Sequence, residues 1–208
     1  MRAIILAAGL GKRMLPLTAN IHKTLLEIGG RSILGRIVDA LITNDVRDLT
    51  IVTGYRAREL HDFMAQHFPK VKVQWVHNDK YETTNNIYSL SLALEQTASE
   101  DTILIESDLV FDPSIISKLL QSSYDATALV SLYEAGMDGT VVSLSRDVIS
   151  AIHPPHLQGD DFVFRDKYKT LPSILMPAVL LVARIVMCLS FLMASITLAN
   201  GGNGWKQK

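Results

Sequence analysis

A glycine-rich loop with two basic residues follows the first apolar run of the chain, Arg2–Ala7. The loop reads Gly9-Leu10-Gly11-Lys12-Arg13. Backbone N–H groups that such glycines expose can bind phosphate oxygens, and the two cations add charged donors beside them. The chemistry indicated is the binding of a phosphate-bearing ligand at the end of a strand.

Two common phosphate-binding fingerprints do not fit this loop. The P-loop pattern requires a glycine five residues before Gly11 and Ser or Thr after Lys12, where the chain has Leu6 and Arg13. The dinucleotide-binding pattern requires a third glycine where Met14 stands. A tight strand-to-helix turn with two solvated cations is the alternative interpretation of a bare glycine pair.

Two carboxylates stand at the end of a later apolar segment, Ile103-Leu104-Ile105-Glu106-Ser107-Asp108. Open α/β sheets bind ligands beyond the carboxyl ends of their strands. The alternation of a strand points Glu106 and Asp108 to the same side. A hard divalent cation prefers such oxygen ligands, whereas the alternative for Asp108 is a plain turn residue at a strand end.

Asn85 and Asn86 begin a predicted helix. Each side chain can cap the helix, and each amide also carries the donors and the acceptor needed to bind a base or ribose. Capping alone is the alternative for either residue. Tyr81 and Tyr88 stand nearby in the sequence and offer the aromatic faces that a quaternary ammonium requires.

The segments that carry these residues alternate between strand and helix patterns. Strands are predicted over 2–7, 49–53, 71–76, 102–105, 126–133, 140–144 and 148–152, and helices over 32–43, 56–67 and 85–96. A further helix is expected after Asp112-Pro113, with Asp112 as its N-cap and Pro113 in its first position. Alternation through Leu120 predicts an α/β fold, with a parallel sheet covered by helices on both faces.

The string from Leu6 to Thr18 resembles the signature loop of the nucleotidyltransferase superfamily that makes sugar nucleotides and CDP-alcohols. Lys23 stands where the family places a second phosphate-binding lysine, and Thr24 replaces the usual proline after it. The segments 78–81 and 85–90 resemble the branch that acts on phosphocholine and 2-aminoethylphosphonate. The resemblance covers about 170 of the 208 residues. It implies a Rossmann-like, mostly parallel mixed sheet of the nucleotide-diphospho-sugar transferase type, incomplete at its C-terminal end.

The resemblance also implies roles for particular residues. Asp108 matches the family's Mg²⁺ ligand, so Mg²⁺ is the expected cofactor; Glu106, where many relatives carry Asp, is a candidate for metal or amine binding. The catalytic set is Arg13, Lys23 and Asp108. The nucleotide-binding set is Leu6, Ala7, Ala8, Gly9, Gly11, Lys12, Arg13, Lys23, Asn85, Asn86 and Ser89, and the substrate set is Tyr81, Tyr88 and Glu106.

The implied reaction is transfer of a cytidylyl group from CTP to a small phosphonate or phosphate that carries an amine, with release of pyrophosphate. The acceptor oxygen is already ionised near pH 7, so catalysis reduces to positioning and charge neutralisation. We expect 2-aminoethylphosphonate rather than phosphocholine as the acceptor. A sugar-1-phosphate nucleotidyltransferase and a non-catalytic nucleotide-binding remnant are the alternatives.

The composition narrows the function classes. With 20 basic and 21 acidic residues the net charge is −1, which argues against a nucleic-acid-binding surface. The apolar run Ala3–Ala8 is too short for a signal-peptide core. The single cysteine, Cys188, excludes an intrachain disulfide framework, and we expect a cytoplasmic protein.

The last segment of the chain differs from the rest. Residues 171–208 contain no acidic residue, and their only cations are Arg184, Lys206 and Lys208, so we expect a partial nucleotidyltransferase domain over 1–170 and an atypical apolar tail. The tail is predicted to form a helix that is apolar on every side and packs poorly on the sheet. It could be a buried helix, or a membrane contact over 171–199, where Arg184 would cost about 2.5–3.5 kcal/mol. Truncation or a frameshift near Thr170 is the interpretation we favour.

Overall fold

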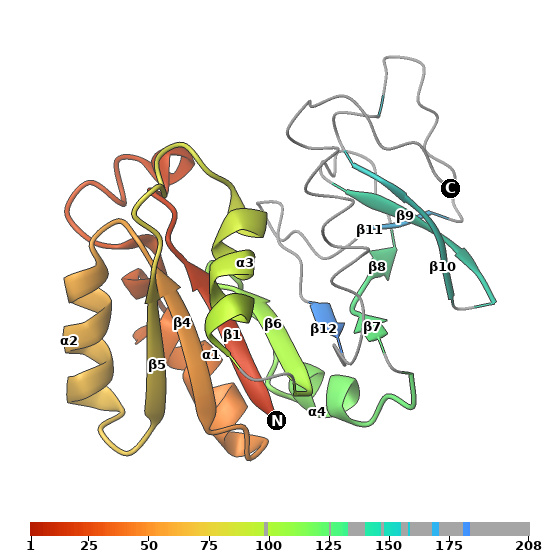
Figure 1. Cartoon of the computed structure of the whole chain (residues 1–208), viewed down its shortest axis with the longest axis horizontal. Coiled ribbons are helices and arrows are strands. Elements are labelled where there is room, and N and C mark those ends of the chain that lie inside the picture. The colour runs from red at the N-terminus through yellow and green to blue at the C-terminus, as the bar shows by residue number, and fades with distance from the viewer. Residues whose placement is uncertain are drawn as a thin grey trace.

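The computed structural model describes residues 1–97, 100–124, 126–132, 140–146, 148–154, 158, 168–170 and 181–183. Its main body is a six-stranded sheet in the order β5-β4-β1-β6-β12-β7. The first four of these strands run parallel, and β12 lies antiparallel to both of its neighbours. A second sheet, in the order β10-β9-β11-β8, lies beside the β7 edge of the first (Figure 1).

Most of the helices and strands lie where the sequence pattern predicts them. The main sheet contains β1 (Arg2–Ala7), β4 (Asp48–Thr53), β5 (Lys72–His77), β6 (Thr102–Glu106), β7 (Ala126–Ala128) and β12 (Leu181–Ala183). The second sheet contains β8 (Ser131–Leu132), β9 (Val141–Ser145), β10 (Val148–His153) and β11 (Tyr168–Thr170). The helices are α1 (Ile33–Thr43), α2 (Ala57–His67), α3 (Asn86–Gln96) and α4 (Ser114–Leu120), with 3-10 turns η1 (Lys12–Met14) and η2 (Lys23–Leu25).

Helices cover both faces of the main sheet, as predicted. One face packs against α1, α2 and α4, through buried residues such as Ile37, Leu60 and Ile116. The other face packs against α3, where Leu90 and Ala93 meet the strands. Because β1 and its neighbours are buried on both sides, they have continuous apolar sequences instead of alternating ones. This confirms the Rossmann-like, mostly parallel mixed sheet.

Two local predictions need correction, and one hairpin was not predicted. The strand expected over 126–133 is divided between the two sheets, because the chain leaves the main sheet between β7 and β8. The N-cap of α4 is Pro113, not Asp112, although Asp112 Oδ1 still accepts a hydrogen bond from the N–H of Ser114 at 2.8 Å. A small hairpin of β2 (Glu27–Ile28) and β3 (Arg31–Ser32) was missed, although its two-residue glycine turn is a recognised sequence signal.

The prediction of a tail helix that packs poorly on the sheet is wrong at Leu181–Ala183. These residues form the strand β12, which pairs with β6 and β7 inside the main sheet. A short apolar run fits a buried strand as well as a buried helix, so periodicity alone cannot separate the two. The rest of 171–208 lies outside the described residues, and the domain boundary at residue 170 stays a prediction. Among the described residues, no helix has the length and apolarity needed to cross a bilayer.

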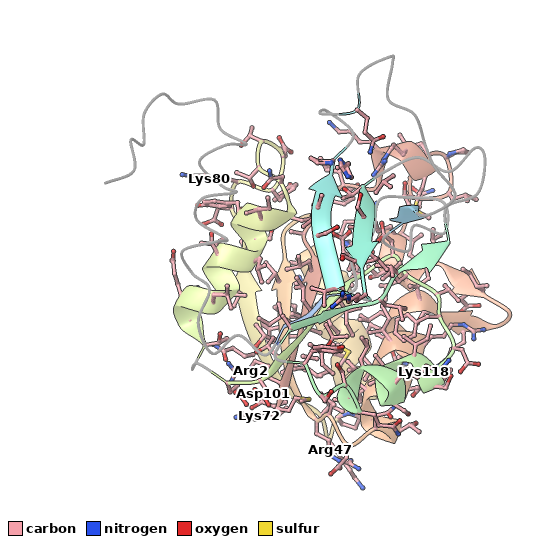
Figure 2. All side chains as sticks on the ribbon, turned by 90° about the vertical axis from the view of Figure 1, so that its right-hand side faces the viewer. Arg2, Arg47, Lys72, Lys80, Asp101 and Lys118 are labelled. Carbon is pink, nitrogen blue, oxygen red and sulfur yellow. The ribbon has the colours of Figure 1, made fainter. Side chains whose placement is uncertain are left out.

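The two ends of the main sheet differ in what they carry. Figure 2 shows Arg2, Lys72 and Asp101, which stand at or just before the first residues of their strands, at one end of the molecule. Lys80, which follows β5, lies at the opposite end. The glycine loop after β1 and the carboxylates at the end of β6 follow the carboxyl ends of parallel strands. They therefore belong to the Lys80 end, where open α/β sheets bind ligands.

Candidate active site

The glycine loop is shaped by Gly11, whose backbone lies in the left-handed region at φ 66°. A Cβ at this position would lie 3.2 Å from Lys23 Cβ and 3.3 Å from Thr18 Cγ2. Thr18 Oγ1 donates a hydrogen bond to the Gly11 carbonyl at 2.9 Å and so closes the loop. A Cβ on Gly9 would lie 3.9 Å from Lys23 Nζ, so both glycines adjoin the lysine side chain.

Lys23 and Asp108 form an ion pair across 85 residues of sequence. Lys23 Nζ donates to Asp108 Oδ2 at 2.8 Å, and the two side chains are only 16% and 9% exposed. Burial of a single charge is strongly unfavourable, and the two side chains can be buried because they pair with each other. A cation suited to phosphate and an anion suited to a metal thus lie one hydrogen bond apart.

Asn86 and Glu106 form a second contact between distant elements. Asn86 Nδ2, in the first turn of α3, donates to Glu106 Oε1 at 2.8 Å. Asn85 is the N-cap of α3, and its Oδ1 accepts from the N–H groups of Ile87 and Tyr88 at 3.1 and 3.3 Å. The capping role of Asn85 is therefore confirmed, while Asn86 links the start of α3 to the end of β6.

Gly54, directly after β4, lets three strand ends converge. A Cβ on Gly54 would lie 2.6 Å from Tyr81 Cβ and 2.8 Å from the carbonyl oxygen of Ala8, distances that real Cβ atoms do not tolerate. The N–H of Tyr55 donates to that same Ala8 carbonyl at 3.1 Å. The segments after β1, β4 and β5 consequently pack together at the site, and Tyr81 is fixed among them.

The structure does not bring the other predicted nucleotide-binding and substrate residues into a single cluster. Lys12 and Arg13 are exposed on η1, and within the described part of the chain neither makes an ion pair.

Ser89 is buried and accepts a hydrogen bond from Asn78 Nδ2 at 3.0 Å. Tyr88 lies under the ammonium of Lys80, whose Nζ is 5.9 Å from the ring centroid. Leu6, Ala7 and Ala8 form the buried end of β1 and the first step of the loop.

The carboxylate of Asp108 has one oxygen suited to a metal ion. Its Oδ1 is buried and, among the described residues, has no hydrogen-bond partner, which is uncommon for a carboxylate oxygen. Mg²⁺ typically binds one or two protein carboxylates and takes its other ligands from water and substrate phosphates. No group of three His, Cys, Asp or Glu side chains suited to a metal occurs within the described ranges. The donors present fit Mg²⁺ bound together with a polyphosphate.

His22, next to Lys23, holds the turn η2 in place. Its side chain is fully buried, and its Nδ1 accepts from the N–H of Thr24 at 3.2 Å. Burial, and secondly the charge of Lys23, lower the pKa of His22 to about 4. The ring is therefore neutral at physiological pH, and the hydrogen bond from the Thr24 N–H to Nδ1 favours the tautomer with the proton on Nε2.

The lowered pKa of His22 predicts a stability change with pH. The unfolded chain binds this proton near pH 6.5, but the folded protein resists it down to about pH 4. The contribution is fully present above pH 6.5 and declines between pH 6.5 and 4, by about 3 kcal/mol in total. Denaturant unfolding of the wild-type protein and of His22→Asn at pH 7 and pH 4 measures it.

The substitution His22→Asn keeps an acceptor for the Thr24 N–H, because Asn bonds readily to the backbone two residues on. It removes the titrating group. The difference in unfolding free energy between the two proteins should therefore shrink as the pH falls. Parallel pH profiles would contradict the lowered pKa.

Sequence reasoning missed several residues that position the site. Asn78 is buried, and its Nδ2 donates to the hydroxyls of Thr84 and Ser89 at 3.1 and 3.0 Å. Arg56 and Glu59 contact the loop that leads to Lys23. Gly54 had a visible signal, since a glycine directly after an apolar strand indicates close backbone approach. The other contacts join residues far apart in sequence and leave no local pattern.

Comparison with known proteins gives a consistent result. Residues 3–169 match the family model of the MobA-like NTP transferase domain. The chain is 33% identical over 168 residues to choline-phosphate cytidylyltransferase of Haemophilus influenzae, covering 78% of this chain and 68% of that protein. It is 36% identical over 108 residues to 2-aminoethylphosphonate cytidylyltransferase of Lancefieldella rimae, covering 52% of this chain and 43% of that protein.

The solved structures support the fold. The structure of CTP:phosphocholine cytidylyltransferase from Streptococcus pneumoniae superposes with a TM-score of 0.66 at 24% identity, covering 95% of this chain and 78% of that one. The share of the curated relatives that this chain spans varies widely: for the first four it is 23%, 68%, 52% and 43%. For three of them it is thus less than two thirds.

Proposed function

The chain belongs to the family of MobA-like NTP transferase domains, and on that premise we propose that it transfers a cytidylyl group from CTP to a small phosphonate or phosphate that bears an amine. The cytidylyltransferases among its relatives support the choice of CTP. The proposed nucleotide-binding residues are the glycine loop with Lys12 and Arg13, together with Lys23 and the start of α3.

The observation that carries the proposal is the buried ion pair of Lys23 and Asp108 beside the left-handed Gly11. A lysine and the backbone of a glycine loop suit phosphate oxygens. A carboxylate whose buried Oδ1 has no hydrogen-bond partner among the described residues suits Mg²⁺. Together they form a site for a metal-bound triphosphate at the end of the sheet where such ligands bind.

The reaction needs little from the protein beyond positioning. An ionised oxygen of the acceptor forms a bond to the α-phosphorus of CTP, the bond to the bridging oxygen breaks, and the electron pair leaves with pyrophosphate. No proton has to be removed from the acceptor, so a general base is unnecessary. Lys23 and Arg13 would hold the triphosphate and offset charge on the departing group. Mg²⁺ bound by Asp108 would neutralise further charge on the phosphates.

The acceptor we propose is a phosphonate with a primary amine, of the 2-aminoethylphosphonate type. Glu106 supplies a carboxylate two residues from Asp108 and is oriented by Asn86, which suits a primary ammonium that donates hydrogen bonds. A quaternary ammonium would instead need an aromatic face. The face of Tyr88 already lies under the ammonium of Lys80, which makes it a poorer choline site.

Pyrophosphate release with CTP and Mg²⁺ tests this function. We expect turnover with 2-aminoethylphosphonate to exceed turnover with phosphocholine. The substitution Glu106→Gln preserves an oxygen that can accept from Asn86 but removes the charge. It should lower kcat/KM for 2-aminoethylphosphonate roughly tenfold to a hundredfold, the value of one charge-assisted hydrogen bond.

The same assay contains its own controls. Phosphocholine cannot donate a hydrogen bond from its ammonium, so Glu106→Gln should affect phosphocholine turnover less. A strong preference of the wild-type protein for phosphocholine would contradict the proposed acceptor. Release of pyrophosphate with glucose 1-phosphate alone would contradict the proposed reaction and indicate a sugar-phosphate enzyme instead.

A further inference from the structure

The segment that delivers Lys23 to the site has little apolar anchoring. Between Gly9 and Ile21 only Thr18 is buried, and Leu15 and Leu17 are exposed. Packing against the core therefore does little to hold this part of the chain. Polar contacts must fix the backbone just before Lys23.

Arg56 supplies two of these contacts. Its Nη1 donates to the carbonyl of Asn20 and its Nη2 to the carbonyl of Ala19, both at 3.0 Å. Its Nε donates to the hydroxyl of Tyr55 at 3.1 Å, and the guanidinium lies 5.5 Å from the centre of that ring. A planar fork with several donors suits two neighbouring carbonyls as no lysine could.

Arg56 also stands in the left-handed region, at φ 49°, where it is the N-cap of α2. A non-glycine residue adopts this conformation only when its surroundings determine it, and such residues cluster at functional sites. Here the unusual backbone places the side chain against the 19–20 carbonyls.

Glu59 supplies the third contact. Its Oε2 accepts from the N–H of His22 at 2.8 Å, and its Oε1 pairs with Arg56 Nη1. The carboxylate lies in the first turn of α2, where the helix dipole favours a negative charge. Both of its oxygens are thus used, one on the residue next to Lys23 and one on the arginine that holds the preceding backbone.

We propose that Arg56 and Glu59 are positioning residues that set the backbone of 19–22 so that Lys23 reaches Asp108 and the triphosphate. Neither residue touches the reacting atoms. The importance of this role for catalysis rests on the proposed function, in which Lys23 binds CTP. Whether Arg56 and Glu59 hold residues 19–22 in place can be measured without an activity assay.

Hydrogen exchange and CTP kinetics test the proposal together. In Glu59→Ala and Arg56→Ala the amide of His22, which donates to Glu59, should exchange faster, whereas those of β4 should not change. The KM for CTP should rise by roughly tenfold, and the KM for the acceptor should stay near the wild-type value. Glu59→Gln keeps an acceptor for the His22 N–H and should restore much of the exchange protection.

Arg58→Ala is the matched control for Arg56→Ala, because it removes a positive charge two residues away, in the first turn of the same helix. Arg58 is 94% exposed and lies 4.0 Å from Asp62, without contact to the loop. Exchange at the His22 amide that is equal in Arg56→Ala, Glu59→Ala and Arg58→Ala would overturn the proposal. Faster exchange with an unchanged KM for CTP would overturn the catalytic part. If the wild-type protein shows no turnover with CTP, the proposed function fails, and the exchange comparison still decides whether the pair holds the segment.

Discussion

Replacing Asp108 with Asn should lower the rate of pyrophosphate release by about a hundredfold to a thousandfold, the range measured when one preorganised charge-stabilising group is lost. Asn has nearly the same size as Asp but carries no charge, so it would bind Mg²⁺ poorly. The carboxylate concerned is almost buried and bonded to Lys23 at 2.8 Å. The measurement is the rate at saturating CTP and acceptor over a range of Mg²⁺ concentrations.

Asp112→Asn is the control for Asp108→Asn. It removes the same charge four residues away, and Asn can replace Asp112 in its hydrogen bond to the Ser114 N–H. Turnover of this variant should equal that of the wild-type protein. If Asp108→Asn keeps wild-type turnover and Mg²⁺ dependence, the metal-binding role is wrong. A loss of turnover no larger than the unfolded fraction would show that the aspartate is only structural.

The main sheet could be predicted because its strands carry their own signal. The segments that form β1, β4 and β6 are short apolar runs bounded by glycine or polar residues, and the helices between them have a clear apolar face. The local sequence pattern gave the wrong prediction where contacts between distant elements determine the secondary structure. Leu181–Ala183 form a strand because β6 and β7 lie on either side of them. The 126–133 strand is split because two different sheets compete for it.

The candidate site also has residues that could be predicted from the sequence and contacts that could not. Gly11 and Asp108 could be identified because a glycine loop and a strand-end carboxylate are local features. Lys23 was identified only from the family resemblance, and the structure brings it into contact with Asp108. The hydrogen bond of Asn86 to Glu106 spans 20 residues and that of His22 to Glu59 spans 37. Such contacts depend on the crossing of distant elements, about which the spacing of residues says nothing.

Replacing Lys23 with Met should weaken CTP binding by roughly 1.5–3 kcal/mol, the value of a hydrogen bond to a charged group. The same loss should lower kcat/KM by roughly tenfold to a hundredfold. Met matches the length of the lysine stem, which packs beside Gly11. The loss would come from the missing ammonium, which in the structure bonds to Asp108. Calorimetric titration with Mg²⁺–CTP and steady-state kinetics measure the two effects.

Two further variants, Arg13→Met and Lys118→Met, test whether weaker CTP binding depends on where the cation lies or only on the loss of a positive charge. Arg13 is exposed and lacks the ion pair that fixes Lys23, so Arg13→Met should weaken CTP binding less than Lys23→Met does. Lys118 lies on α4 at the end of the molecule opposite to Lys80 (Figure 2), and Lys118→Met should leave CTP binding unchanged. Equal losses for all three variants would mean that net charge, not the site, governs binding. Unchanged affinity in both Lys23→Met and Arg13→Met would remove the basis for a triphosphate at this loop, because its two proposed cationic ligands would then contribute nothing.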